Sequence, residues 1–155
     1  GNYFGNSGTS YPTSQVKNCY CKTSYVKARA EAGGFAGATG WGYFVNCKAF
    51  VNGNITTYNH NESDYPEYRY TVVGGFVGSI SNGCVMVFCS TEFDSVINDG
   101  YYGVGGFGGI AWESNISNCY AKGNLVRGAD VVGGFIASGV VNISNCYTTT
   151  KVEIF

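Results

Sequence analysis

The chain has 155 residues, with 9 Lys and Arg against 10 Asp and Glu, and a formal net charge of −1. This balance excludes a basic surface large enough to neutralise a row of phosphates, so we expect no nucleic-acid partner. No apolar run approaches the ~18 residues of a membrane-spanning helix, so we expect no membrane insertion. The 24 glycines and 23 tyrosines and phenylalanines favour strands and turns.

Residues 1–14, GNYFGNSGTSYPTS, come before any repeated pattern. We predict that they form an N-terminal arm or cap. The chain begins with Gly1 and shows no signal peptide, which is the pattern expected of a processed mature chain or a trimmed one.

Two sequence blocks alternate through residues 15–155. Gly-Gly-Phe occurs four times, at Phe35, Phe76, Phe107 and Phe135. A block close to Asn-Cys-Tyr occurs five times, around Cys19, Cys47, Cys89, Cys119 and Cys146. The two blocks keep the same phase, because Cys19 precedes Gly33 by 14 residues and Cys119 precedes Gly133 by 14. The chain therefore repeats a unit of about 28 residues.

Each block also predicts its own local structure. An apolar residue stands three positions before every block cysteine, at Val16, Phe44, Met86, Ile116 and Ile143. This spacing fits a strand, a bend at the asparagine and a second strand. Asparagine tolerates unusual backbone angles, and asparagines stacked at one corner can bond each other through their amides.

Short strands, glycine turns and a period of 28 residues predict an all-β fold, a β-solenoid of about five coils. Coils stacked at about 4.8 Å would span roughly 24 Å. We expect Gly-Gly to mark a tight turn or a close backbone approach, and the following phenylalanines to stack inside. The solenoid would cover residues 15–155, with an insertion at about 52–69.

The repeat resembles the GLUG motif of bacterial surface proteins. The nearest copy is VGGFGGIAWESNISNCYAKG at 104–123, and VGGFIASGVVNISNCYTT at 132–149 is almost as near. The second unit departs more, because Phe88 replaces the asparagine. The resemblance covers about residues 15–155. It implies extracellular repeat proteins with solenoid-like folds, often in adhesins, and it supplies no catalytic residues.

The chain has seven cysteines, an odd number: Cys19, Cys21, Cys47, Cys84, Cys89, Cys119 and Cys146. Stacked on neighbouring coils, the block cysteines would lie at separations that disulfides accept, and we expect at least one disulfide, with all seven as candidates. The alternative is that they pack as small buried hydrophobes. Cys21 and Cys84 lie outside the repeat, and one cysteine can join two chains. Connectivity cannot be read from the sequence.

No cluster of residues indicates catalysis, and we expect no enzyme, metal or cofactor. The single histidine, His60, lies in the insertion with polar neighbours and no nucleophile motif. A calcium site there is an alternative to a solvated loop, although the EF-hand spacing is absent. The carboxylates that polysaccharide cleavage would need stand at different repeat phases: Glu31, Asp99, Glu113 and Asp130.

Outward side chains offer a further surface. Tyr20, Tyr120 and Tyr147 follow block cysteines, so they point outward if the cysteines point inward. Such tyrosines bind sugars or pack on another subunit in some proteins, but stacking that stabilises the sheet is the favoured interpretation. Glycosylation sequons begin at Asn54, Asn61, Asn115 and Asn142 and matter only in a source that glycosylates.

The chain closes on Lys151-Val-Glu-Ile-Phe155, which is strand-like and has no polar cap. A free apolar strand edge pairs readily with another chain. We therefore expect a secreted, cell-surface structural protein that assembles with itself, head to tail, into a fibre. The candidate assembly residues are Tyr3, Phe4, Val152, Ile154 and Phe155. The alternative is an adhesin-type module that binds surface carbohydrate or protein.

Overall fold

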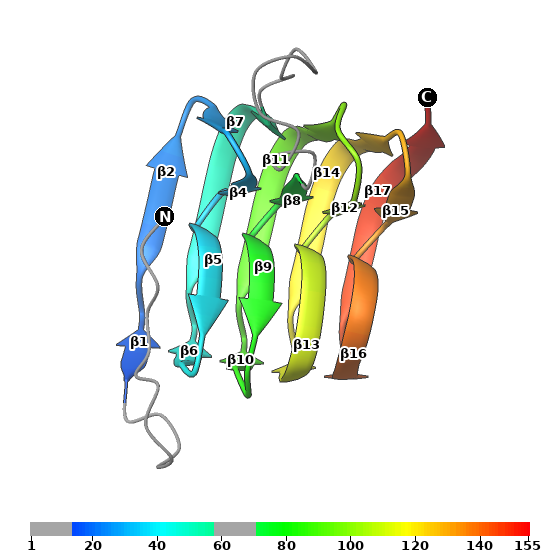
Figure 1. The fold of residues 1–155 in the computed structure, drawn as a ribbon. Coiled ribbons are helices and arrows are strands. Elements are labelled where there is room, and N and C mark those ends of the chain that lie inside the picture. The colour runs from blue at the N-terminus through cyan, green and yellow to red at the C-terminus, as the bar shows by residue number, and fades with distance from the viewer. Residues whose placement is uncertain (1–13, 58–70) are drawn as a thin grey trace.

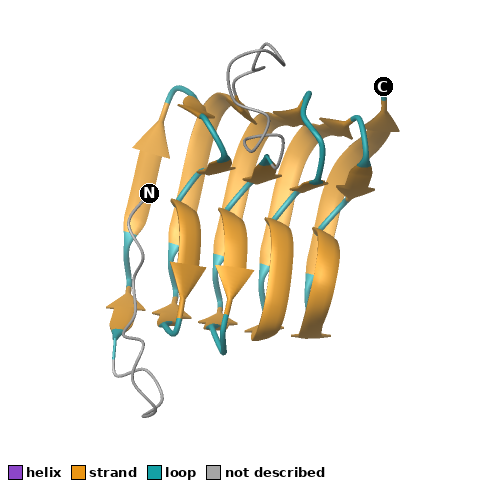
Figure 2. Cartoon of the chain, viewed as in Figure 1, coloured by secondary structure: helices purple, strands orange, loops and turns teal. Residues whose placement is uncertain are grey.

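The structure, a computed structural model, describes residues 14–57 and 71–155. Within these ranges the chain forms strands and no helix (Figure 2). Parallel strands stack turn upon turn into a β-solenoid, with the first and last turns at opposite ends of the stack (Figure 1). The prediction of an all-β solenoid is confirmed. Four turns follow one another, and the last strand begins the next.

Seventeen strands, counted over the described residues, make up these turns. The first turn holds β1 (Gln15–Lys17), β2 (Tyr20–Thr23), β3 (Val26–Ala28), β4 (Glu31–Gly33) and β5 (Ala36–Gly40). The second holds β6 (Tyr43–Val45), β7 (Lys48–Thr57), β8 (Val72–Gly74) and β9 (Val77–Ser81). The third holds β10 (Val85–Val87), β11 (Ser90–Asn98), β12 (Gly103–Gly105) and β13 (Gly108–Ser117). The fourth holds β14 (Tyr120–Gly128), β15 (Val131–Gly133) and β16 (Ile136–Ser144), and β17 (Tyr147–Ile154) follows.

The strands form three parallel sheets, one on each side of the coil. The first sheet contains β1, β6, β10, β13, β9, β5 and β16, and the second contains β2, β3, β7, β11, β14 and β17. The third is the smallest, in the order β15, β12, β8 and β4. Strand β7 runs on to Thr57, so the first residues of the predicted insertion at 52–69 continue the sheet. The rest of the insertion lies outside the described residues, as does most of the predicted arm at 1–14.

The residue before each block cysteine forms the predicted bend. All five have left-handed backbone angles: Asn18 (φ 54°), Asn46 (φ 52°), Phe88 (φ 55°), Asn118 (φ 52°) and Asn145 (φ 51°). At one such corner the amides also meet between coils, since Asn46 Nδ2 donates to Asn18 Oδ1 at 2.8 Å. The expected bend is confirmed at each corner, and the expected amide contact is confirmed there.

Phe88 is the one corner residue that is not asparagine, and we expect Phe88→Asn to stabilise the fold. A bulky residue is strained at a positive φ, whereas asparagine visits this region routinely. Phe88 is 57% exposed, so replacing its ring removes few packing contacts. The free energy of unfolding should rise by about 1 kcal/mol. Urea unfolding measures the change. Phe88→Ala is the matched control, because it removes the ring without supplying a residue suited to the bend.

The Gly-Gly-Phe blocks bring successive turns together. A Cβ on Gly75 would lie 2.0 Å from the Gly106 carbonyl oxygen, and one on Gly106 would lie 2.1 Å from that of Gly134. Beside this contact the phenylalanines stack in one column, with ring centroids 4.9, 4.9 and 4.8 Å apart from Phe35 to Phe135. Both predictions for this block, the close backbone approach and the inward aromatic stack, are confirmed.

The core runs along the solenoid axis. It consists of columns in which one residue from each turn faces inward, at the same rung of the sheet. One such column is Val16, Phe44, Met86, Ile116 and Ile143. A second column is Val26, Ile55, Val96, Val126 and Val152. Within each column the central residues are buried, and the outermost ones are more accessible.

Candidate functional site

The last turn presents core-type side chains to solvent. Ile143 is 46% exposed, whereas Ile116, one rung below in the same column, is 1% exposed. Val152 is 45% exposed, and its partner Val126 is fully buried. The sequence places an apolar residue at both rungs of each column. The difference in exposure therefore arises because a further turn covers the buried residue and none covers the exposed one. This end of the solenoid has the surface of a core that lacks its next layer.

The backbone at this end is equally open. Within the described residues β15 pairs only with β12, β16 only with β13, and β17 only with β14. Each strand therefore turns one row of N–H and C=O groups away from the stack. Such a row is a template for pairing with another strand. Together, β15, β16 and β17 form what we call the terminal face.

Three of the predicted assembly residues lie on this terminal face. Val152 and Ile154 belong to β17, and Ile154 is 68% exposed. Phe155 follows the strand, where its N–H donates to the Gly128 carbonyl at 3.0 Å and its ring lies 4.1 Å from the Arg127 guanidinium. The other two, Tyr3 and Phe4, lie outside the described residues.

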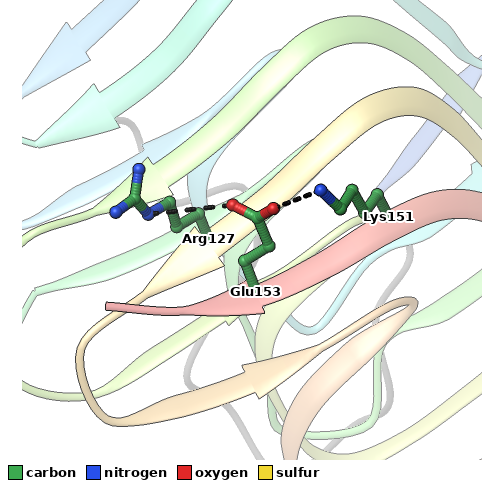
Figure 3. Close-up of polar contacts among 3 residues, drawn as sticks. All are labelled: Arg127, Lys151 and Glu153. Carbon is green, nitrogen blue, oxygen red and sulfur yellow. Dashed lines mark ion pairs between the residues drawn. The ribbon is translucent and has the colours of Figure 1, made fainter.

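A small charged cluster stands on the outer side of β17. Glu153 pairs with Lys151 at 2.5 Å and with Arg127 of β14 at 4.0 Å (Figure 3). The hydrogen bond and the charge of Lys151 lower the pKa of Glu153. Because Lys151 is exposed and Glu153 is only partly buried, this pair contributes little to stability. The Glu153 carboxylate therefore lies at the outer edge of the terminal face, beside its apolar centre.

The opposite end of the stack is also open within the described residues. Here β1 pairs only with β6, and β2 and β3 pair only with β7. Val16 and Val26 are half-buried at the ends of their columns, and Cys19 is exposed. The two ends therefore carry matching inward residues.

All seven cysteines carry free thiols in the structure. Cys47, Cys89 and Cys119 point inward and are buried, which accords with packing as small hydrophobes. Burial raises the pKa of Cys47 to about 11. The hydrogen bond to Cys119, followed by burial, raises the pKa of Cys89. The thiols of Cys47 and Cys89 are therefore poor nucleophiles at neutral pH. The predicted disulfide remains untested.

The remaining cysteines differ in their surroundings. Cys84 is fully buried outside the repeated column, with its sulfur 3.5 Å from Thr39 Oγ1. Cys21 and Cys146 are half-buried in the end turns, and Cys146 accepts a bond from the Cys119 N–H at 3.4 Å. Access to the thiols is thus highest at the two ends of the stack.

The outward tyrosines are placed as predicted. Tyr20 and Tyr147 are 64% and 57% exposed. The Tyr120 and Tyr147 rings stack on neighbouring turns with centroids 5.3 Å apart. This contact supports the favoured interpretation, in which the tyrosines stabilise the sheet.

Three of the four sequon asparagines are described and exposed on strands. Asn54 accepts a hydrogen bond from Ser95 Oγ at 2.7 Å. Asn142 Nδ2 donates to Asn115 Oδ1 at 2.9 Å, so these two amides bond each other across turns. Asn61 lies outside the described residues. Glycosylation at the four sequons remains a prediction.

An open groove of about 310 Å³ crosses the outer side of the second sheet. Phe50, Glu92, Asp94, Lys122 and Asn124 contribute to its lining. It lies where the pairing register shifts next to Phe93, because a shift in register interrupts the sheet surface. An aromatic ring beside carboxylate and amide groups suits a polyol or sugar. Sequence reasoning did not find this groove, because a register shift leaves no repeated sequence signal.

Sequence reasoning also missed Asn98, a fully buried residue at the end of β11. Its Oδ1 accepts hydrogen bonds from Thr57 Oγ1 at 3.1 Å, Thr71 Oγ1 at 2.7 Å and the Gly100 N–H at 3.0 Å. Its Nδ2 donates to the Thr71 carbonyl at 2.8 Å. Thr57 and Thr71 stand on either side of residues 58–70. Asn98 therefore bonds Thr57 and Thr71, the two described residues that flank this range.

Ranges 14–57 and 71–155 contain no group of three or more His, Cys, Asp or Glu side chains placed to hold a metal ion. The part of the chain that the structure describes has no helix long and apolar enough to cross a membrane. His60 and the polar residues around it in the predicted insertion lie outside these ranges.

The fold and its repeat define a β-solenoid repeat protein. Residues 100–126 match the family model of the GLUG motif, which confirms the resemblance predicted from the sequence over these residues. The match spans the third-turn strand β12, the whole of β13 and most of β14. No curated protein matches the chain, and no solved structure matches it.

Proposed function

We propose that this chain is a non-enzymatic structural subunit that stacks end to end into an extracellular, cell-surface fibre. One observation carries the proposal: the terminal face joins exposed core-type side chains, Ile143 and Val152, to three unpaired strand edges. The resemblance of the repeat to a motif of bacterial surface proteins supports the location. No metal or cofactor enters the proposal.

The terminal face is a surface that a further turn could cover. Each turn of a solenoid contacts only its neighbours, so an end turn lacks half of the contacts of a central one. Covering the terminal face would bury apolar area and pair the open backbone groups. The opposite end carries matching inward residues, Val16 and Val26, on strands of the same parallel sheets, so a parallel continuation joins the terminal face of one copy to the opposite end of the next. Identical head-to-tail contacts that do not close into a ring generate a filament.

Val152→Glu tests the proposal. Val152 faces inward at an uncovered rung, so a carboxylate there stays in water in a single subunit but becomes buried and unpaired in a stack. We expect the variant to keep its β-sheet circular dichroism and to raise the concentration needed for fibre formation by more than tenfold. Sedimentation and negative-stain electron microscopy measure the assembly.

Thr149→Glu is the matched control. Thr149 lies on the same strand, but its side chain faces outward, next to Lys122. The Thr149→Glu variant should therefore form fibres at the same concentration as the wild-type chain. A wild-type chain that remains monomeric at high concentration contradicts the proposal. So does a Val152→Glu variant that assembles as well as the control.

The second candidate function is an adhesin-type binding module. The groove beside Phe50 favours it, because it combines an aromatic ring with carboxylate and amide groups. A glycan array separates the two candidates. Saturable binding by a stable monomer would support the module, and fibres without carbohydrate binding would support the structural subunit.

A further inference from the structure

We infer that the groove on the outer side of the second sheet binds a non-acidic saccharide, held by packing on Phe50 and by hydrogen bonds to Asp94 and Asn124. The inference gives the second candidate function, on which it rests, a site and a class of ligand. It does not depend on fibre formation, because the groove is lined from β7, β11 and β14, and only Thr149 comes from the terminal face.

Two shifts in strand register shape the groove. Between β7 and β11 two residues, Asn52 and Gly53, oppose the single Asp94. Between β14 and β17 two residues, Gly123 and Asn124, oppose a single one, whereas β11 and β14 stay in register with each other. An extra residue bends its strand and re-aims the neighbouring side chains, and such bulges are common beside active sites. Two of them at one level of the sheet hollow the outer surface between them.

The residues that line the groove form a floor and two walls. Val51 and Phe93 point inward and are 1% and 5% exposed, so they close the floor. The outward residues form two neighbouring columns, because side chains alternate along each strand. The columns are Phe50, Glu92 and Lys122 on one side, and Asn52, Asp94 and Asn124 on the other. A ligand that lies between the columns contacts both.

Neighbouring side chains hold the first column in place. Lys22, on the adjacent turn, places its Nζ 5.6 Å from the centroid of the Phe50 ring. Tyr120 Oη donates a hydrogen bond to Glu92 Oε1 at 3.4 Å. Groups that are already positioned lose less conformational freedom when a ligand binds. Phe50 therefore offers a fixed apolar surface for the C–H face of a sugar ring.

The second column supplies hydrogen-bonding groups that the described part of the chain does not use. Asp94 and Asn124 are exposed, and their side chains form no hydrogen bond or ion pair within the described residues. A carboxylate accepts hydrogen bonds, and an amide both donates and accepts them. Hydroxyl groups also donate and accept. Asp94 and Asn124, which face each other on paired strands, therefore suit two neighbouring hydroxyl groups of one sugar ring.

Charge and size limit the ligand. The lining carries two carboxylates, Glu92 and Asp94, against one ammonium group, Lys122. A sugar with a carboxylate or sulfate group would meet like charge here, which disfavours acidic glycans. The volume of about 310 Å³ lies at the lower end of the range of about 300–1,000 Å³ typical of small-molecule sites. The groove therefore suits a short segment of a non-acidic glycan.

Isothermal titration calorimetry with two matched variants tests the inference. The probes are oligosaccharides of glucose, mannose and galactose, of glucosamine, and of glucuronic acid. We expect saturable binding of a non-acidic probe, and about tenfold weaker binding to Asp94→Ala, which lacks the charged acceptor. Asp130→Ala is the control, because it removes an exposed carboxylate from the turn between β14 and β15, outside the groove. It should bind like the wild type.

Phe50→Leu tests the role of the ring. Leucine keeps this position apolar but removes the flat surface, so we expect binding to weaken several-fold while the circular dichroism spectrum stays unchanged. Binding equal to that of the wild type would contradict the packing of the sugar on Phe50.

Three results of the titrations would overturn the inference. Tighter binding of the glucuronic acid probes contradicts the selection by charge. Equal binding by Asp94→Ala and Asp130→Ala places the saccharide elsewhere, so the binding module stands and the groove falls. If no non-acidic probe binds saturably, the groove and the carbohydrate-binding module fall together. Sedimentation of the same proteins measures assembly separately, so none of these results decides whether the chain forms fibres.

Discussion

Gly106→Ala is expected to destabilise the solenoid by about 3 kcal/mol, at the upper end of the usual cost of overpacking. A Cβ at this position would lie 2.1 Å from the carbonyl oxygen of Gly134 on the next turn. That oxygen belongs to the backbone, which hydrogen bonds hold on both sides of Gly134. The Gly106 N–H donates to the Gly133 carbonyl at 3.2 Å, and the Phe107 N–H donates to the Phe135 carbonyl at 2.8 Å. Relief of the clash therefore requires two turns to separate. Urea unfolding, followed by circular dichroism, measures the loss.

Gly134→Ala is the control for this prediction, because it makes the same change at the same repeat position of the last described turn. The nearest atom to a Cβ on Gly134 is the Thr148 methyl carbon at 3.1 Å, which belongs to a side chain. The neighbour needs to move only a few tenths of an ångström. We expect a loss below about 1 kcal/mol. Equal losses for the two variants would show that the close approach between turns does not limit the fold.

Asn98→Ala is expected to cost about 3 kcal/mol, because one substitution leaves several buried groups without partners. The hydroxyls of Thr57 and Thr71 and the Gly100 N–H lose their common acceptor, and the Thr71 carbonyl loses its donor. Each orphaned buried group carries a desolvation penalty. Water entering the space vacated by the amide offsets part of the penalty.

Two readouts check this second prediction. Thermal unfolding should show a lower midpoint for Asn98→Ala, and limited proteolysis should show faster cleavage between Thr57 and Thr71, because Asn98 bonds both of these residues. Asn124→Ala is the control, since Asn124 is exposed on the neighbouring strand β14. Unchanged cleavage in Asn98→Ala would mean that the two threonines are held by other contacts.

The repeat explains why much of the fold was predictable. A feature that recurs once per turn, such as the bend at Asn46 or the stacking of Phe107, appears in the sequence several times in the same phase. Phase also gave the direction of side chains, since Cys119 is buried and Tyr147 is exposed, as alternation along a strand requires. The residues of the terminal face were predictable in part, because Val152 and Ile154 continue inward positions of the repeat.

Features that occur once were not predictable. Asn98 has no counterpart in the other turns, since Gly128 occupies its rung in the next one. Its four hydrogen bonds depend on three segments that only the fold brings together. The groove beside Phe50 depends on a local shift in strand register. Such a shift leaves no periodic signal in the sequence. Single contacts of this kind become visible only in the folded structure.

The graded burial along the columns has a consequence for how folding and assembly are related. Stability in a stack of turns is close to a sum over neighbouring pairs, so the central turns are held from both sides and the end turns from one. Amide hydrogens in β16 and β17 should therefore exchange with solvent sooner than those in β11, and exchange should slow as protein concentration rises. If the chain stacks as proposed, the affinity of one subunit for the next and the cohesion within a subunit arise from the same kind of contact. A substitution that loosens one inward column is then expected to weaken both the fold and the proposed fibre.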